Sequence, residues 1–344
     1  MPRRTHLRPL LALGSAVALM ATAACSGAAG QPDSGPRELR LAHVFAVDST
    51  QNAAAEEFAD RIEEESDGQL EVTVYPSSQL GSDESLGRDL SRGTLDMAFL
   101  NPGSLASMDP LMDFHYLPYI VSDNQQADQI FYRPDGIIQQ TLHEAHEKHG
   151  MTMLATFELE LRGVTNSSHP VDSVDDLAGL KLRVPGSDAI RGFFDAAGAQ
   201  TQVMPMGDLV SGLQTGTVDG QDNGVQITRD NGLQESQDYF TPTKHVYAIG
   251  TVVMSTEVFD SLTAEQQDLV QEVATDVAAE QVADNRARNQ EYMDAIRDEI
   301  DVTELDGAQM EEFRRFGLSL WDRFADTYGQ DRIDELRSEI EALR

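Results

Sequence analysis

Lysine is nearly absent from this chain of 344 residues, which contains only Lys148, Lys181 and Lys244 and otherwise takes its positive charge from arginine. Asp and Glu number 59 against 25 Lys and Arg, so the formal net charge is −34. A nucleic-acid partner is excluded, because displacing the counterions of a phosphate backbone takes clustered basic residues. We interpret the acidic residues as a solvated surface, and adaptation to a salt-rich habitat is the alternative.

Cysteine occurs once, at Cys25, so a disulfide within the chain is impossible. It follows an arginine-containing segment and an apolar run over 10–20 that is too short to span a bilayer. This order predicts a cleaved signal peptide over residues 1–24. The sequence Thr22-Ala23-Ala24-Cys25 resembles a bacterial lipobox, although Thr22 stands where Leu is usual. We therefore predict an extracytoplasmic protein lipid-anchored at Cys25 to the outer face of the cell membrane, with a flexible tether over 25–36. A plain secretory signal is the alternative, and the choice between Sec and twin-arginine export stays open.

Enzyme signatures are missing as well. The sequence has no G-x-S-x-G, no H-E-x-x-H, no Walker loop and no dinucleotide-binding glycine pattern. His143, His146 and His149 recur at every third position, but on a helix they would spread over about 120°, too wide for one metal ion without outside ligands. We predict a protein that is not an enzyme and that needs no metal and no cofactor.

Strand-like and helix-like segments alternate from residue 39 onward, which predicts an α/β fold. The expected strands lie at 39–43, 70–75, 95–100, 180–184 and 202–204, and the expected helices near 50–67, 83–92, 188–197 and 207–215. A capping box at Thr263 and Gln266 opens a helix that runs to about residue 299. Its length suggests a helix that bridges two lobes, and a solvated surface helix is the alternative.

One arginine stands out by its position. Arg183 lies on a short apolar strand, two residues before Pro185. Ligands of open α/β sheets bind at the carboxyl ends of strands, and a guanidinium offers a planar fork that matches a carboxylate. From the residues alone, Arg183 either binds a ligand or pairs with an acid of its own domain.

Two motifs carry a family resemblance. Residues 176–184 fit the pattern D-L-x-G-L-K-[IL]-R-V, and residues 213–220 fit L-Q-x-G-x-V-D-G. In this order they resemble the DctP-like substrate-binding proteins of tripartite ATP-independent periplasmic (TRAP) transporters, and the likeness covers about residues 37–344. The resemblance implies a two-lobed periplasmic-binding-protein-like fold with a ligand cleft between the lobes. It also implies that the protein captures a small organic carboxylate and delivers it to the small and large permease subunits in the membrane.

The resemblance also implies site residues. Arg183 matches the arginine that pairs with the ligand carboxylate, Arg162 a second cationic contact, and Asn223 a hydrogen-bonding amide. The full expected ligand-binding set is Arg183, Arg162, Asn223, Asn101, Met206, Phe45 and His245. Met206 stands where an aromatic residue is common, which implies a more adaptable pocket wall and leaves the identity of the carboxylate open. Glu158 or Glu160 could recognise a cationic group on a ligand, but we expect both to be exposed acids at a strand end.

The expected division places residues 37–159 and 249–288 in lobe I, and residues 160–248 and 289–344 in lobe II. The lobes are expected to close over the ligand about the long helix, in a monomeric protein. Two alternatives remain: a surface ligand sensor for a signalling partner, and an enzyme acting on an organic acid.

Overall fold

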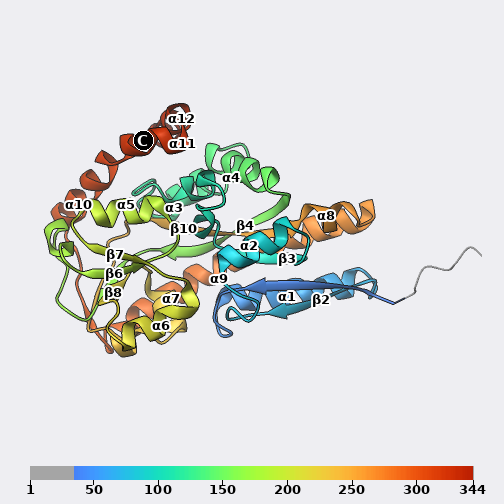
Figure 1. Ribbon diagram of the computed structural model, residues 1–344, viewed down its shortest axis with the longest axis horizontal. Coiled ribbons are helices and arrows are strands. Elements are labelled where there is room, and N and C mark those ends of the chain that lie inside the picture. The colour runs from blue at the N-terminus through green and yellow to red at the C-terminus, as the bar shows by residue number, and fades with distance from the viewer. Residues whose placement is uncertain (1–34, 344) are drawn as a thin grey trace, which may run out of the picture. The chain divides into compact units, whose positions relative to one another are not determined.

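The computed structural model describes residues 35–343. The predicted signal peptide over 1–24, the lipidation site at Cys25 and most of the tether over 25–36 lie outside the described residues. From Pro36 onward the chain forms one unit, and this unit contains two β-sheets (Figure 1). No helix within residues 35–343 has the length and apolar character that crossing a bilayer requires.

The first sheet has the strand order β2-β1-β3-β10-β4. Its strands are β1 (Arg37–His43), β2 (Leu70–Tyr75), β3 (Met97–Leu100), β4 (Met151–Leu161) and β10 (Tyr247–Ser255). The first three strands pair in parallel, because the helices α1 (Thr50–Glu65) and α2 (Asp83–Ser91) return the chain between them. β10 then pairs antiparallel with both β3 and β4. A strand from late in the chain therefore completes a sheet begun at its start.

The second sheet has the strand order β11-β9-β5-β8-β6-β7. Its strands are β5 (Val164–Asn166), β6 (Lys181–Val184), β7 (Gln200–Val203), β8 (Gly220–Gln221), β9 (Tyr239–Thr241) and β11 (Asp301–Val302). β6 pairs in parallel with β7 and β8, and the helices α5 (Asp188–Ala196), α6 (Met206–Gln214) and α7 (Val225–Asp230) connect this region. The expected α/β architecture with two lobes is thus observed.

The chain crosses between the sheets at short links after β4 and after β9, and α9 (Ala264–Ile296) follows both crossings. Its 33 residues correspond to about 50 Å, enough to contact β4 and α1 of the first sheet and α7 of the second. The predicted capping box at Thr263 and Gln266 is present at its start. The remaining α-helices of the described residues are α3 (Asn124–Ile130), α4 (Ile137–Lys148), α8 (Thr256–Asp260), α10 (Gly307–Ser319), α11 (Ala325–Tyr328) and α12 (Gln330–Ala342).

The C-terminal helices contact both halves of the unit. The backbone nitrogen of Val174, beside the second sheet, donates to Glu312 of α10. Tyr328 of α11 donates to Asp113 beside the first sheet at 2.9 Å, and α12 packs on α4. The segment 289–344, expected in lobe II, therefore also joins elements of lobe I, and the lobe boundaries stay a prediction.

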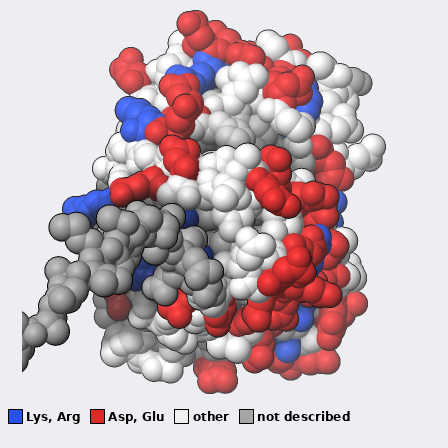
Figure 2. Space-filling view, turned by 90° about the vertical axis from the view of Figure 1, so that its right-hand side faces the viewer, with Lys and Arg blue, Asp and Glu red and all other residues white. Residues whose placement is uncertain are grey.

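Acidic side chains cover much of the visible surface in Figure 2, where Lys and Arg form smaller, separate groups. This distribution agrees with the interpretation of the acidic excess as a solvated surface.

Candidate functional site

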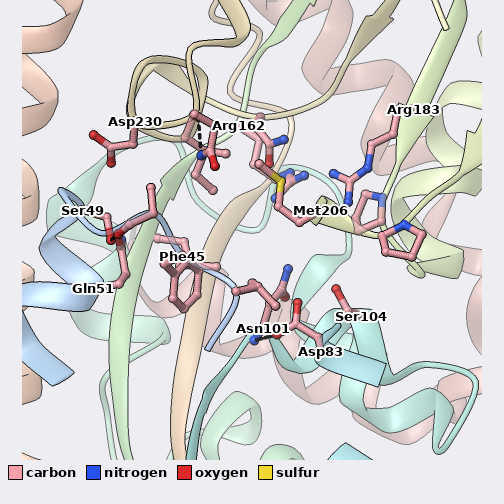
Figure 3. Close-up of a pocket in the computed structure, with 18 of the residues that line it drawn as sticks. Phe45, Ser49, Gln51, Asp83, Asn101, Ser104, Arg162, Arg183, Met206 and Asp230 are labelled. Carbon is pink, nitrogen blue, oxygen red and sulfur yellow. Dashed lines mark hydrogen bonds between the residues drawn. The ribbon is translucent and has the colours of Figure 1, made fainter. Parts of the chain in front are cut away.

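A cavity lies between the two lobes, and residues of both line it (Figure 3). The first lobe contributes the loop after β1, including Phe45, and Asn101 directly after β3. The second lobe contributes Arg183 from β6, Met206 from the start of α6, and the C-terminal end of α7. Several of these side chains stand at carboxyl ends of strands, the usual ligand position in open α/β sheets.

Arg183 extends into this cavity (Figure 3). Its Nε donates to the carbonyl oxygen of Met204 at 2.8 Å, which orients the guanidinium, and the residue is 4% exposed. Among residues 35–343, no carboxylate forms a salt bridge with it. Burial lowers the pKa of Arg183 to about 10, with Asp222 raising it and Arg162 lowering it further, so the group is charged at neutral pH. The site therefore holds a desolvated cation whose two terminal nitrogens can receive a planar anion.

Arg162 also lines the cavity, but its charge is already compensated. Its Nε and Nη2 donate to the two oxygens of Asp222 at 3.0 and 3.1 Å, and both residues are almost fully buried. Burial opposes ionisation of Asp222, but the charges and hydrogen bonds of Arg162 and His245 together outweigh it and hold the pKa of this carboxyl below its usual value. The structure thus makes Arg162 half of a buried ion pair in the pocket wall.

His245, expected among the ligand contacts, does not line the cavity. It is fully buried behind it, where Nδ1 is 2.8 Å from Oγ1 of Thr243 and Nε2 is 3.6 Å from Oδ2 of Asp222. The imidazole ring stacks on Phe193 with ring centroids 5.4 Å apart. The structure therefore places His245 behind the Arg162–Asp222 pair. The other six residues that were expected to contact the ligand all line the cavity, and their contact with a ligand stays a prediction.

Two asparagines supply groups for hydrogen bonds. Asn101 accepts from the hydroxyl of Tyr116 at 2.7 Å through Oδ1, which leaves its Nδ2 as a donor for the cavity. Asn223 donates from Nδ2 to Gln221, which leaves its side-chain oxygen as an acceptor. The apolar walls come from Phe45, whose ring meets Phe157 edge-on at 5.8 Å, and from Met206.

Several lining residues were missed from the sequence. Asp83, the first residue of α2, accepts from the backbone nitrogen of Asn101 at 3.1 Å, and burial raises its pKa to about 7. Asp83 begins the helix that the sequence predicted near 83–92, so this helix start was a local signal at the position. The other lining residues with polar side chains that were missed are Ser49, Gln51, Glu84, Ser104, Asp230 and Asn231. No local pattern singles these six out.

The expectation that Glu158 and Glu160 are exposed was wrong, since both are buried. The two oxygens of Glu160 accept from the backbone nitrogens of Gly224 and Gln226 at 2.7 and 2.9 Å and so cap α7. Glu158 accepts from Arg286 at 2.7 Å. Both carboxylates are used by the fold, because satisfied partners are what allow an acid to be buried.

Two of the three histidines on and after α4 form hydrogen bonds or ion pairs within the fold, and His143 is exposed. Nδ1 of His146 is 2.7 Å from the carbonyl oxygen of Leu142, and Nε2 of His149 is 3.1 Å from Asp109. Within residues 35–343, no three residues among His, Cys, Asp and Glu are arranged to hold a metal ion.

Comparison with known proteins links this geometry to one family. Residues 41–327 match DctP, the bacterial extracellular solute-binding proteins of family 7. The 2,3-diketo-L-gulonate-binding periplasmic protein of Escherichia coli is 31% identical over 235 residues, which are 68% of this chain and 71% of that protein. Among solved structures, a sugar acid binding protein from Advenella mimigardefordensis in complex with galactonate is 27% identical, with a TM-score of 0.85, over 91% of this chain and 100% of that one. A TRAP periplasmic solute binding protein from Sulfurospirillum deleyianum with bound succinate is 26% identical, with a TM-score of 0.80, over 88% and 99% of the two chains.

Proposed function

The chain belongs to family 7 of the bacterial extracellular solute-binding proteins, the receptors of TRAP transporters, and on this premise we propose that Arg183 binds the carboxylate of a small organic acid in its cleft. Proteins of this kind deliver their ligand to permease subunits in the membrane. The family is one of solute-binding proteins, and we propose that the cleft releases its ligand chemically unchanged.

The buried guanidinium of Arg183 is the observation that carries this proposal. A cation that is desolvated and has no carboxylate partner among the described residues is stabilised when a ligand carboxylate arrives. A neutral competitor would leave that charge unpaired, so the same residue gives affinity and specificity. Asn101 and Asn223 can add hydrogen bonds to the polar groups of the ligand. The relatives with galactonate, diketogulonate or succinate all have ligands with a carboxylate.

A thermal-shift screen of ligand-free protein against sugar acids, hydroxy acids and dicarboxylates tests the proposal. A ligand at 100 times its Kd stabilises the fold by about 2.7 kcal/mol, so a true ligand is easily recognised. Arg183→Gln should abolish the shift, while Arg191→Gln, which changes a half-exposed arginine paired with Asp188, should preserve it. The ligand should also be recovered intact after incubation. Shifts of equal size in the Arg183→Gln variant would refute the proposal.

We further propose that Cys25 carries the lipid anchor and that the receptor is a monomer on the outer face of the membrane. The sequence around Cys25 supports the anchor. In the expressing cell, the wild type should partition with membranes and Cys25→Ser should be released. Sedimentation of the protein without its first 35 residues should give the mass of one chain. An unchanged membrane fraction for Cys25→Ser would contradict the anchor.

A further inference from the structure

One acidic side chain of the cavity lies far from Arg183. Figure 3 shows Arg183 and Asp230 at opposite ends of the pocket, with Met206 and Phe45 between them. Asp230 is the last residue of α7, and its Oδ1 accepts from the hydroxyl of Tyr292 at 2.9 Å. Asp83 and Glu84 also line the cavity and act electrostatically on Arg183, so Asp230 is the carboxylate that lies away from this guanidinium.

The neighbouring arginines do not neutralise Asp230 directly. Arg229 forms its salt bridge with Glu299 at 2.7 Å, and Arg288 donates to the backbone oxygen of Asp48. Both guanidinium groups also lie over the ring of Tyr292, at 4.9 and 5.9 Å from its centroid. Among residues 35–343, no salt bridge includes Asp230. Its second oxygen remains available as a hydrogen-bond acceptor.

The other polar side chains at this end also present acceptors. Nε2 of Gln51 donates to the carbonyl oxygen of Glu158, which leaves Oε1 of Gln51 unused. Nδ2 of Asn231 donates to the carbonyl oxygen of Ile227 at 2.9 Å, which leaves Oδ1. The hydroxyl of Ser49 donates to the carbonyl oxygen of Ala46 at 2.7 Å. Nε2 of Gln51 also donates to Oδ1 of Asn285 at 3.3 Å, so both N–H groups of Gln51 are used within the protein.

We propose that the cleft selects a carboxylate that carries a hydroxyl or ammonium group at its opposite end and rejects simple dicarboxylates. The inference rests on the proposed function, because Arg183 must first hold the carboxylate. A distal donor would meet Asp230, Gln51 and Asn231 as acceptors. A second carboxylate is an acceptor and an anion at neutral pH, so it would lose its hydration and face the negative charge of Asp230. The apolar walls between the two ends fit the carbon chain of such a ligand.

Calorimetric titration with two matched ligand series tests this specificity. The first is butanoate, 4-hydroxybutanoate, 4-aminobutanoate and succinate, and the second is the corresponding set with six carbons, which controls for ligand length. The hydroxy or amino acid should bind about tenfold or more tightly than the dicarboxylate of equal length. Within each series, the comparison of the hydroxy acid with the amino acid shows whether the pocket prefers a hydroxyl or an ammonium group.

Asp230→Asn provides the decisive variant, because the amide keeps the shape, removes the charge and adds a donor. It should reduce the preference for the distal donor over the dicarboxylate about tenfold or more. Asp238→Asn, which changes an exposed acid on the same lobe, should leave the preference unchanged.

The possible outcomes distinguish a failure of the proposed function from a failure of this inference alone. Wild-type affinity in Arg183→Gln would overturn the proposed function and this inference with it. If Arg183 is required but the dicarboxylate binds as tightly as the donor-bearing acids, or Asp230→Asn leaves the preference unchanged, only the inference is overturned. A wild type that binds no member of either series overturns it as well, because the pocket then needs more than a carboxylate and one distal donor.

Discussion

Replacing Arg183 by methionine should make the ligand-free protein more stable, although it removes the proposed ligand contact. Folding lowers the pKa of Arg183 from 12.5 to about 10, because burial disfavours its charged form. The charged form therefore costs the native state about 3 kcal/mol at any pH well below 10. Methionine loses the hydrogen bond to the carbonyl oxygen of Met204, worth about 1 kcal/mol, and fills much of the same space. The net expectation is a gain of about 2 kcal/mol in the free energy of unfolding.

Urea denaturation at pH 7 measures this gain, and a thermal scan should show a rise of about 4 °C for a protein of this size. The protein must first be freed of co-purified ligand, because a bound acid stabilises only the wild type. Arg191→Met is the matched control, since its half-exposed guanidinium has no comparable desolvation to relieve. Ligand affinity should fall about 30-fold or more in Arg183→Met and stay unchanged in the control. If Arg183→Met unfolds more easily than both the wild type and the control, then Arg183 supports the fold and the argument for a ligand-directed charge fails.

Three further predictions concern the walls of the cleft. A Cβ on Gly186 would lie 3.0 Å from a backbone carbonyl oxygen of the first lobe, so Gly186→Val should hinder closure of the lobes and weaken ligand binding about tenfold. Gly307→Val is the control, because no atom lies within 4 Å of its Cβ position, and it should bind as the wild type does. Equal affinities of the two variants in titration would contradict this prediction. Asp222→Ala leaves the buried Arg162 without its partner and should cost about 3–5 kcal/mol in urea unfolding, and a loss below 1 kcal/mol would argue against the pair. A bound carboxylate should raise the pKa of Asp83 further above about 7, so that binding takes up a proton and ligand affinity falls as pH rises above 7. Asp83→Asn should make the affinity independent of pH in this range. An unchanged pH dependence in this variant would exclude Asp83 as its source.

Much of the secondary structure was predictable from the periodicity of apolar residues and from helix-capping motifs. The strands expected at 70–75 and 180–184 and the helix expected at 263–299 correspond to β2, β6 and α9 within a few residues. These elements follow from local rules: alternation of apolar residues, a capping box and glycine at helix ends. The pairing of β10 between β3 and β4 was not predictable in the same way, because it joins residues more than 85 positions apart.

The residues of the candidate site also differ in whether a local sequence motif indicates them. Arg183 and Asn223 were indicated by motifs, since each lies in or next to a short stretch of contiguous sequence. Asp230 and Gln51 carry no such signal, and they line the cavity only because the end of α7 and the start of α1 both border it. Glu160 shows the converse, since an acid expected at the surface is buried once Gly224 and Gln226 offer their backbone nitrogens.

The sequence by itself determined the type of protein, the α/β elements and the arginine that we propose as the carboxylate-binding residue. All three are encoded in local patterns of a few to a few dozen residues. Only the tertiary structure decided that Arg162 is neutralised by Asp222, that His245 stands behind the pocket, and that Asp230 faces the ligand space opposite Arg183. The physical reason is that the charge state and hydrogen-bonding capacity of a side chain depend on which groups from distant segments surround it and on how much water they exclude.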